Sequence, residues 1–361
     1  MAAGSFPTPT RVDDLPVQMS AKTALRASLA RVLFSAGLTA PGRRGRERLT
    51  VATFHRVLPE GERRAYPYRG LVVTPEELDA HLAFFTRHFD CGTLAAQHRR
   101  FMGGEATRRP LLAITFDDGQ HDNFRTARPV LARHRVKASF FVPVSAVERG
   151  ELLWHDRLGF AISALLGEAR GGTEKLERIL ETAGLPIGGR HCTADRAAQG
   201  SKTLAPQARL RLVEALEQAS GSARPPAFAR MMSFVEIAEL AADGHEIGSH
   251  SMTHRMMTEC DDEALAYEVS ESRARLESRL GRPVESFCYP NGNCDARSAG
   301  AVIAAGYFRA VTTVPGRNER GTDPFRLNRY DMDASRTRGG REEFEPAVLA
   351  LRISGAYPNL R

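Results

Sequence analysis

Short apolar runs that alternate with helical patterns are the feature that most limits the fold of this chain. The runs 111–116 and 138–142 are almost entirely apolar, which is typical of strands buried on both faces of a parallel sheet. The run 49–54 forms a further compact strand, and 286–289 and 307–313 repeat the pattern near the C-terminal end. Repeated β-then-α units predict an α/β fold with a parallel sheet, closed as a barrel or doubly wound.

Two helix starts are marked by capping boxes. Thr74-Pro75-Glu76-Glu77 combines a capping threonine with proline at the first helical position, and predicts a helix through His88. Ser233-Phe-Val-Glu236 predicts a second helix that stops at Gly244. Apolar spacing predicts another helix over 262–280.

Residues 151–230 interrupt the β/α rhythm. They carry helical patterns joined by Gly- and Pro-rich loops, and therefore predict a helical insertion; the patterns cover 152–166, 174–183 and 206–218. We expect three parts: an N-terminal extension over 1–48, a barrel formed by 49–150 and 231–361, and the insertion. The barrel part has 233 residues, close to the ~250 typical of a single β/α barrel.

The N-terminal extension shows no convincing signal peptide. Residues 1–18 are polar and include Asp13 and Asp14, where an apolar segment would be required. The stretch 24–34 has helical apolar spacing with arginines on its other side, and is too short and too charged to span a bilayer. It predicts a docking helix, with weak membrane-surface contact as the alternative. The basic cluster at 43–48 predicts a solvated linker, and the compartment and oligomeric state stay open.

The net charge of +7 first suggests a nucleic-acid partner. However, the chain has only four lysines among its 50 basic residues, so the surplus reflects a general preference for arginine. No groove-reading helix, stacking platform or phosphate loop accompanies it, and we expect no nucleic-acid partner. The five scattered cysteines include no C-x-x-C pair, which argues against a disulfide framework and a cysteine zinc site.

Polar residues directly follow one buried strand. Parallel β/α folds place their chemistry at the carboxyl ends of strands, and Asp117-Asp118-Gly119 stands where the run 111–116 ends. Because neighbouring side chains diverge, one carboxylate can bind a metal while the other faces a water.

The segment His250-Ser-Met-Thr-His254 supplies two further metal-binding side chains. The spacing places two imidazoles about one helical turn apart, so that both can reach one cation. Two histidines and one carboxylate form the ligand set of an open catalytic zinc site. Core or surface histidines would explain this spacing alone; together with the strand-end carboxylates it favours a metal centre.

These two motifs resemble a known family. Thr115-Phe116-Asp117-Asp118-Gly119 followed by His250-Ser-Met-Thr-His254 is similar to the polysaccharide deacetylases that share the NodB homology domain, carbohydrate esterase family 4. The resemblance covers about 49–143 and 231–331, and the segments 53–57, 138–142, 240–254 and 287–292 occur in the same order.

The resemblance implies a distorted (β/α) barrel and a hydrolase that removes N-acetyl groups from a polysaccharide or oligosaccharide. Its substrate is then an N-acetylated glycan. By the same resemblance, Asp118, His250 and His254 hold a divalent metal, usually Zn²⁺ with Co²⁺ as an alternative. Asp117 is the general base for the attacking water.

The third motif of the family is commonly Arg-x-Pro-Tyr, and the matching residues here are Cys288-Tyr289-Pro290-Asn291. The arginine that would orient the base is absent. The segment resembles a subgroup with Phe-x-Tyr-Pro-x-Gly, and a backbone N–H near Tyr289 or Asn291 could complete an oxyanion hole.

The last family motif, Leu-x-His, matches Leu327-Asn328-Arg329, which places arginine where the general acid usually stands. Arginine does not readily donate that proton. His55 is the substitute candidate because it ends the first strand; the alternative is a histidine that only ties down the strand end. Arg329 could hold Asp117, contact substrate, or form a surface salt bridge.

Two other functions stay open at this stage. The missing arginine and histidine would suit a non-catalytic glycan-binding or export subunit, and the metal motif would also suit a hydrolase of small cyclic amides. An open groove would favour a polymer and a closed pocket a small molecule, and the insertion could form either wall. Trp154 at its start either packs the insertion or stacks on a sugar.

Overall fold

The computed structural model describes residues 21–41, 48–168, 170–185, 192–221, 224–339 and 343–355. The polar segment 1–18 and residues 43–47 of the basic cluster lie outside them. The strands are β1 (Leu49–Phe54), β2 (Arg56–Val57), β3 (Val72–Val73), β4 (Asp90–Gly92), β5 (Leu111–Phe116), β6 (Ser139–Val142), β7 (Glu246–Ser249), β8 (Ser286–Cys288), β9 (Arg309–Val311) and β10 (Tyr330–Asp331). The helices are α1 (Ala21–Ser35), α2 (Glu60–Ala65), α3 (Pro75–His88), α4 (Leu94–Met102), α5 (Arg128–Arg133), α6 (Val144–Arg149), α7 (Trp154–Leu166), α8 (Gly172–Thr182), α9 (Ala194–Ser201), α10 (Pro206–Ala219), α11 (Phe234–Ala242), α12 (Asp262–Ala266), α13 (Ser272–Leu280), α14 (Ala296–Ala304), α15 (Ala334–Thr337) and α16 (Pro346–Ser354).

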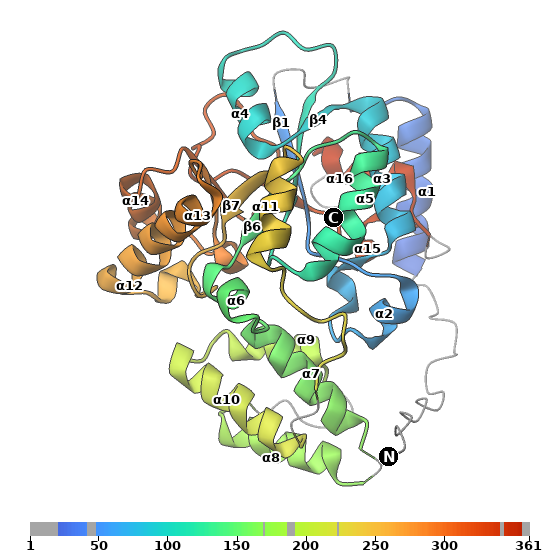
Figure 1. Ribbon diagram of the computed structural model, residues 1–361. Helices are drawn as coiled ribbons and strands as arrows, with labels where there is room; N and C mark the ends of the chain where they lie inside the picture. Colours follow the sequence, from blue (N-terminus) through green and yellow to red (C-terminus); the bar gives the residue numbers. More distant parts are fainter. Residues whose placement is uncertain are drawn as a thin grey trace.

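A parallel eight-stranded sheet forms the centre of the molecule (Figure 1). Its order is β10-β1-β5-β6-β7-β8-β9, with β4 paired to β5. The segment before β10 joins the two edges, because Leu327 forms a parallel bridge with Val311 of β9 while β10 pairs with β1. The sheet therefore curls into a distorted barrel, and the doubly wound alternative is excluded.

The apolar runs form buried strands, as the sequence predicted. Every residue of β1 and β5 is buried. Leu49 and Val51 pack in one cluster with Leu111 and Ala113, while the alternate residues join a larger cluster beneath the surrounding helices. Because both faces of these strands are covered, the sequence shows continuous apolar runs instead of alternation.

Both predicted capping boxes are confirmed. At the start of α3, the Thr74 hydroxyl accepts a hydrogen bond from the Glu77 N–H at 3.2 Å, and the Glu77 carboxylate accepts one from the Thr74 N–H at 2.8 Å. Ser233 and Glu236 repeat this arrangement at α11. The helix predicted over 262–280 consists of α12 and α13 with a π-helical turn between them.

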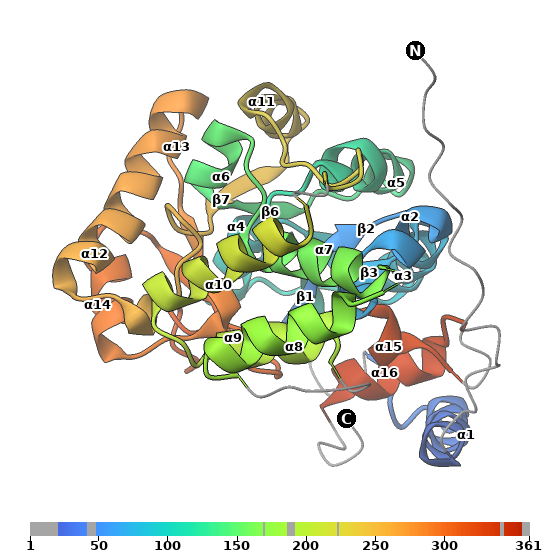
Figure 2. The ribbon, with the colours of Figure 1, turned by 90° about the horizontal axis from the view of Figure 1, so that it is seen from below.

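The insertion (151–230) carries helices α7–α10 between β6 and β7. These helices share a hydrophobic cluster with Leu58, Tyr66, Tyr68 and Val72 of the barrel. Helices α7, α8 and α10 match the three predicted patterns, whereas α9 was missed because its buried residues are small, mainly alanine. The insertion lies below the barrel in Figure 1, and in Figure 2 it stands in front of the sheet. It therefore covers one end of the barrel.

The N-terminal helix α1 docks on α16. Ala27 and Ala30 pack against Val348 and Leu351, and small residues allow this close approach. Within the described ranges, no helix combines the length and the apolar character that crossing a membrane requires.

Candidate active site

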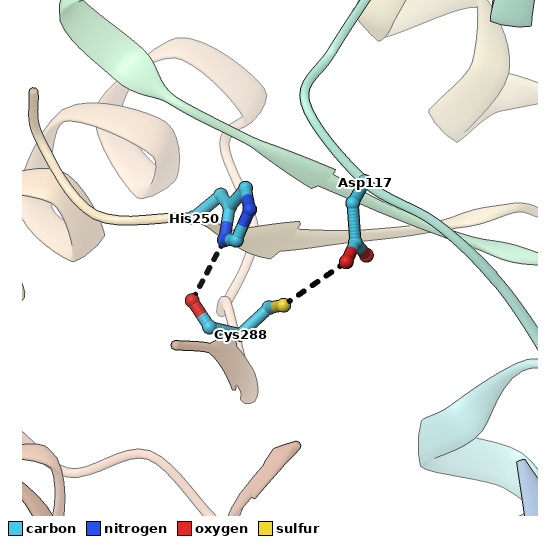
Figure 3. Close-up of side chains that lie close together, drawn as sticks. All are labelled: Asp117, His250 and Cys288. Carbon is cyan, nitrogen blue, oxygen red and sulfur yellow. Dashed lines mark hydrogen bonds between the residues drawn. The ribbon is translucent and has the colours of Figure 1, made fainter. Parts of the chain in front are cut away.

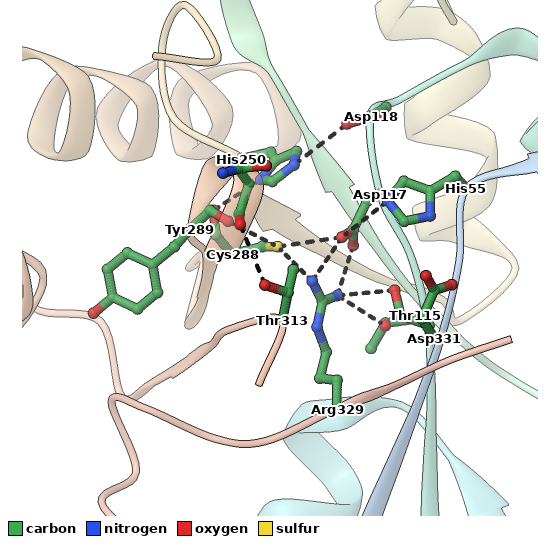
Figure 4. Close-up of polar contacts among 12 residues, drawn as sticks. His55, Thr115, Asp117, Asp118, His250, Cys288, Tyr289, Thr313, Arg329 and Asp331 are labelled. Carbon is green, nitrogen blue, oxygen red and sulfur yellow. Dashed lines mark hydrogen bonds and ion pairs between the residues drawn. The ribbon is translucent and has the colours of Figure 1, made fainter. Parts of the chain in front are cut away.

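Four of the predicted site residues lie at the carboxyl ends of strands, close to Arg329 (Figure 4). His55 follows β1, Asp117 and Asp118 follow β5, His250 follows β7, and Arg329 immediately precedes β10. All of them line one cavity of about 450 Å³, as do His254, Tyr289 and Asn291.

The turn after β5 separates the two adjacent carboxylates. Asp118 has φ +72° and Gly119 has φ +64°, so two consecutive residues lie in the left-handed region. This conformation is costly for aspartate and is typical of functional sites. A Cβ atom at Gly119 would lie 3.1 Å from Pro143 Cδ, which leaves little room for a larger residue. As a result Asp117 faces Arg329, whereas Asp118 faces the two histidines.

Asp118, His250 and His254 form a buried group that fits a metal ion. Asp118 Oδ1 lies 3.4 Å from His250 Nε2 and 3.2 Å from His254 Nε2. Ligands about 2.1 Å from a tetrahedral zinc ion lie about 3.4 Å apart, so these separations suit a shared ion. Burial lowers the pKa of His254 to about 4 despite the neighbouring carboxylate, so its imidazole is in the neutral form that binds metals.

The histidines reach this position on a loop, so the expected helical turn is wrong. Ser251 and His254 have φ of +65° and +60°, and the Ser251 hydroxyl accepts a hydrogen bond from the His254 N–H at 2.9 Å. His250 Nδ1 lies 2.8 Å from the Cys288 carbonyl oxygen, and donating to it directs Nε2 toward Asp118. Burial opposes the charged form of His250, but Cys288 and the hydrogen bond to Asp118 raise its pKa, so a metal ion would displace a proton from Nε2. The loop brings both Nε2 atoms to one point without a helix.

Asp117, His250 and Cys288 form a second cluster of potential ligands (Figure 3). It suits a metal less well, because both Asp117 oxygens and His250 Nδ1 already form hydrogen bonds. Burial raises the pKa of the Cys288 thiol, which therefore stays protonated and donates to Asp117 Oδ2 at 3.5 Å.

Arg329 holds Asp117 through two parallel hydrogen bonds. Nη1 donates to Oδ1 at 2.8 Å and Nη2 donates to Oδ2 at 2.7 Å, and both side chains are buried. The guanidinium also donates to the Thr312 carbonyl at 2.7 Å and to the Thr53 hydroxyl at 2.9 Å. Burial opposes the charged form of Asp117, but Arg329 overcomes it and lowers the pKa of the carboxyl. Of the alternatives for Arg329, the structure therefore supports the contact with Asp117.

His55 stands on the other side of Asp117. Its Nε2 atom lies 4.0 Å from Asp117 Oδ2, and its side chain is 18% exposed toward the cavity. The backbone is fixed because the His55 carbonyl accepts a hydrogen bond from Asn123 Nδ2 at 2.8 Å. Among the described residues the imidazole forms no hydrogen bond, so it can contact a bound molecule in the cavity.

The segment 289–291 lines the cavity with fewer free donors than expected. The Tyr289 N–H donates to the Val311 carbonyl at 3.2 Å within the sheet, and Pro290 has no N–H. Asn291 remains as the backbone donor of this segment that can face a ligand. The Tyr289 phenol donates to the Phe325 carbonyl at 3.1 Å.

Sequence reasoning missed the buried network that joins the insertion to the site. Asp156 accepts hydrogen bonds from the Tyr66 hydroxyl and from Gln120 Nε2, both at 2.6 Å. Gln120 follows the Asp117-Asp118-Gly119 turn directly, and His155 Nε2 lies 3.9 Å from Asp118 Oδ2. The polar triplet Trp154-His155-Asp156 was visible in the sequence, but its partners are more than 30 residues away.

This geometry defines a class of protein: a hydrolase on a parallel β/α barrel, with two histidines and one aspartate grouped for a metal beside an arginine-bound carboxylate. The model of the polysaccharide deacetylase family matches residues 104–310, more than half of the chain. The chain thus belongs to the polysaccharide deacetylase family and is an N-deacetylase, a hydrolase that acts on glycans.

Solved structures share the fold at low sequence identity. The deacetylase PplD of Streptococcus pyogenes in complex with acetate aligns with a TM-score of 0.56 and 15% identity over 85% of this chain and 98% of its own. IcaB from Ammonifex degensii aligns with a TM-score of 0.53 and 17% identity over 86% and 97%. A comparison with curated protein sequences finds no match.

Proposed function

We propose that this chain is a metal-dependent hydrolase that removes N-acetyl groups from a polysaccharide or oligosaccharide. The observation that carries the proposal is the pairing of Asp117 with Arg329 directly beside the Asp118–His250–His254 group. One carboxylate is thereby fixed for proton transfer while the other is available to a metal.

In this proposal Asp118, His250 and His254 hold a divalent ion, Zn²⁺ or Co²⁺. Such an ion would act as a Lewis acid on the acetamide carbonyl and make water a stronger nucleophile at neutral pH. Asp117 accepts the proton of the attacking water, and Arg329 keeps its carboxylate ionised and correctly oriented. The Asn291 N–H donates to the developing oxyanion.

His55 donates the proton to the leaving amine. It lies beside Asp117 at the edge of the cavity, and no other contact of its ring competes with a substrate among the described residues. Arg329 is fully engaged with Asp117 and the strand ends, and its guanidinium does not give up a proton readily.

We further propose that the chain belongs to the subgroup with the Phe-x-Tyr-Pro-x-Gly third motif. The position of the missing arginine is taken by Cys288, and Arg329, directly before β10, binds the proposed base. The absence of the usual arginine and of the last-motif histidine were the two reasons to consider a non-catalytic glycan-binding or export subunit. In this proposal Arg329 takes the place of the arginine and His55 that of the histidine.

Acetate release from defined N-acetylated glycans, with Zn²⁺ or Co²⁺ added and metal content measured, tests the proposal. Asp117→Asn should abolish turnover and retain one bound metal, whereas Asp118→Ala should lose both. Asp79→Asn, a change at a surface ion pair, is the matched control and should keep both. Full activity in Asp117→Asn would contradict the assignment of the base.

A further inference from the structure

We propose that the insertion closes the catalytic cleft into a pocket that accepts the terminal N-acetylated sugar of a glycan and excludes sugars in the middle of a chain. This inference rests on the proposed function and names the part of the substrate on which it acts.

The insertion forms the wall opposite the strand ends. Trp154 and His155 at the start of α7, and Asp195, Gln199 and Lys202 on and after α9, line the same cavity as the metal group. The cavity of about 450 Å³ lies toward the small end of the range of about 300–1,000 Å³ for sites that enclose small ligands. Figure 2 shows the insertion in front of the sheet, and we call the insertion residues that line the cavity its roof and the barrel residues that line it its floor.

This roof is tied to the barrel on several sides of the metal group. The Tyr68 hydroxyl, in the segment between α2 and β3, donates to the His155 carbonyl at 2.6 Å. On the side of β8, Lys202 Nζ donates to Asn291 Oδ1 at 2.6 Å. A long glycan that crosses the site needs the cleft to be open at both ends. In this proposal the Lys202–Asn291 contact closes one of these ends.

A third connection lies behind the loop that carries the histidines. Arg209 of α10 is buried and binds Glu259 through two hydrogen bonds of 2.5 and 3.2 Å. Its guanidinium also lies over the Trp154 ring, 5.1 Å from the centroid. One face of Trp154 is therefore covered by the insertion itself, and only the remaining surface is available to a sugar.

The roof is close to the reacting centre. His155 Nε2 lies 3.9 Å from Asp118 Oδ2, and the His155 and His254 rings are 5.6 Å apart. A sugar whose acetamide reaches the metal group must lie beneath His155. Among the described residues, Asp331 and Arg336 line the cavity away from the insertion, and the Arg336 side chain is 47% exposed. In this proposal the rest of the glycan leaves on that side.

The test uses N-acetylglucosamine oligomers of increasing length, from the single sugar to the hexamer, with the metal-loaded full-length enzyme. Tandem mass spectrometry of end-labelled products locates each free amine. We expect one acetate per chain, released from one terminal sugar at every length. Free amines at internal sugars of the wild-type product would overturn the inference while leaving the proposed deacetylase function intact.

The Lys202–Asn291 contact is tested with two matched lysine variants. Lys202→Ala removes a charged hydrogen bond to Asn291 and should raise the rate at internal sugars about tenfold. Lys175→Ala removes a lysine of the same insertion that pairs with Glu168 outside the cavity, and should keep the wild-type pattern. An unchanged pattern in Lys202→Ala would overturn the role of this contact in closing the cleft.

If no oligomer releases acetate, the binding affinity of the oligomers tests the inference instead. In calorimetry with the metal-loaded Asp117→Asn variant, a pocket predicts affinity that stops rising after the first one or two sugars. A steady gain up to the hexamer would indicate a groove and overturn the inference. Binding of none of the oligomers would count against the proposed function as well.

Discussion

The ion pair between Asp117 and Arg329 can be tested through its contribution to stability. Arg329→Met removes both hydrogen bonds to Asp117 and leaves a carboxylate whose side chain is only 3% exposed. Breaking a buried ion pair from one side typically costs about 3–5 kcal/mol, because the remaining charge is left without a partner. Asp117→Asn leaves the buried guanidinium with a neutral neighbour and should cost a similar amount.

The double variant separates the pair from its surroundings. With both charges removed, Arg329→Met/Asp117→Asn should be less destabilised than the sum of the single variants, by about 2–3 kcal/mol. Guanidinium chloride unfolding followed by circular dichroism, in the presence of a chelator, measures all four free energies of unfolding without a contribution from bound metal.

Two outcomes would refute this reasoning. A cost below about 1 kcal/mol for Arg329→Met would show that Asp117 does not depend on this partner. Additive effects in the double variant would show that the two side chains stabilise the protein independently. Arg329→Lys is a useful comparison, because an ammonium keeps the charge but cannot form the two parallel hydrogen bonds.

Three further predictions concern individual side chains. His55→Gln should lower the rate of acetate release by about 10²–10⁴-fold with unchanged metal content, as expected for a general acid; an unchanged rate would leave His55 a structural role. Asp156→Ala leaves Tyr66 and Gln120 without their buried acceptor, and should cost about 2–4 kcal/mol and increase proteolysis within the insertion. Burial lowers the pKa of His81 to about 4; because the unfolded chain binds this proton below about pH 6.5, stability should fall between pH 6.5 and 4 by about 3 kcal/mol. His81→Phe should lack this part of the pH dependence in denaturant titrations, and the same slope in both proteins would contradict the prediction.

The sequence predicts the strands well because they depend on short-range pattern. Continuous apolar runs mark the buried strands, and Asp118 follows one of them directly. The spacing of His250 and His254 predicted that their imidazoles meet, as they do at Asp118, but it predicted the wrong local structure, because a loop with residues of positive φ also brings both imidazoles together.

The contacts around the base could not be derived in the same way. Arg329 lies 212 positions from Asp117 in the chain, and β10 beside it has only two residues, which is too short for a periodic signal. Helix α9, which forms part of the roof over the site, was not predicted for a related reason. It buries mainly alanines, so its sequence lacks the apolar stripe that marks a helix. In both cases tertiary contacts decide the structure, and a single sequence does not encode them locally.

The closure of the barrel near its C-terminal end has a consequence for biosynthesis. All three proposed metal ligands and Asp117 precede residue 255, whereas Arg329 is carried by the segment that joins β9 to β1. A growing chain on the ribosome thus contains the complete proposed metal group long before the residue that binds Asp117. The Asp117 carboxylate acquires its partner in the same step that closes the sheet, so chains that stop before this segment cannot assemble the full site.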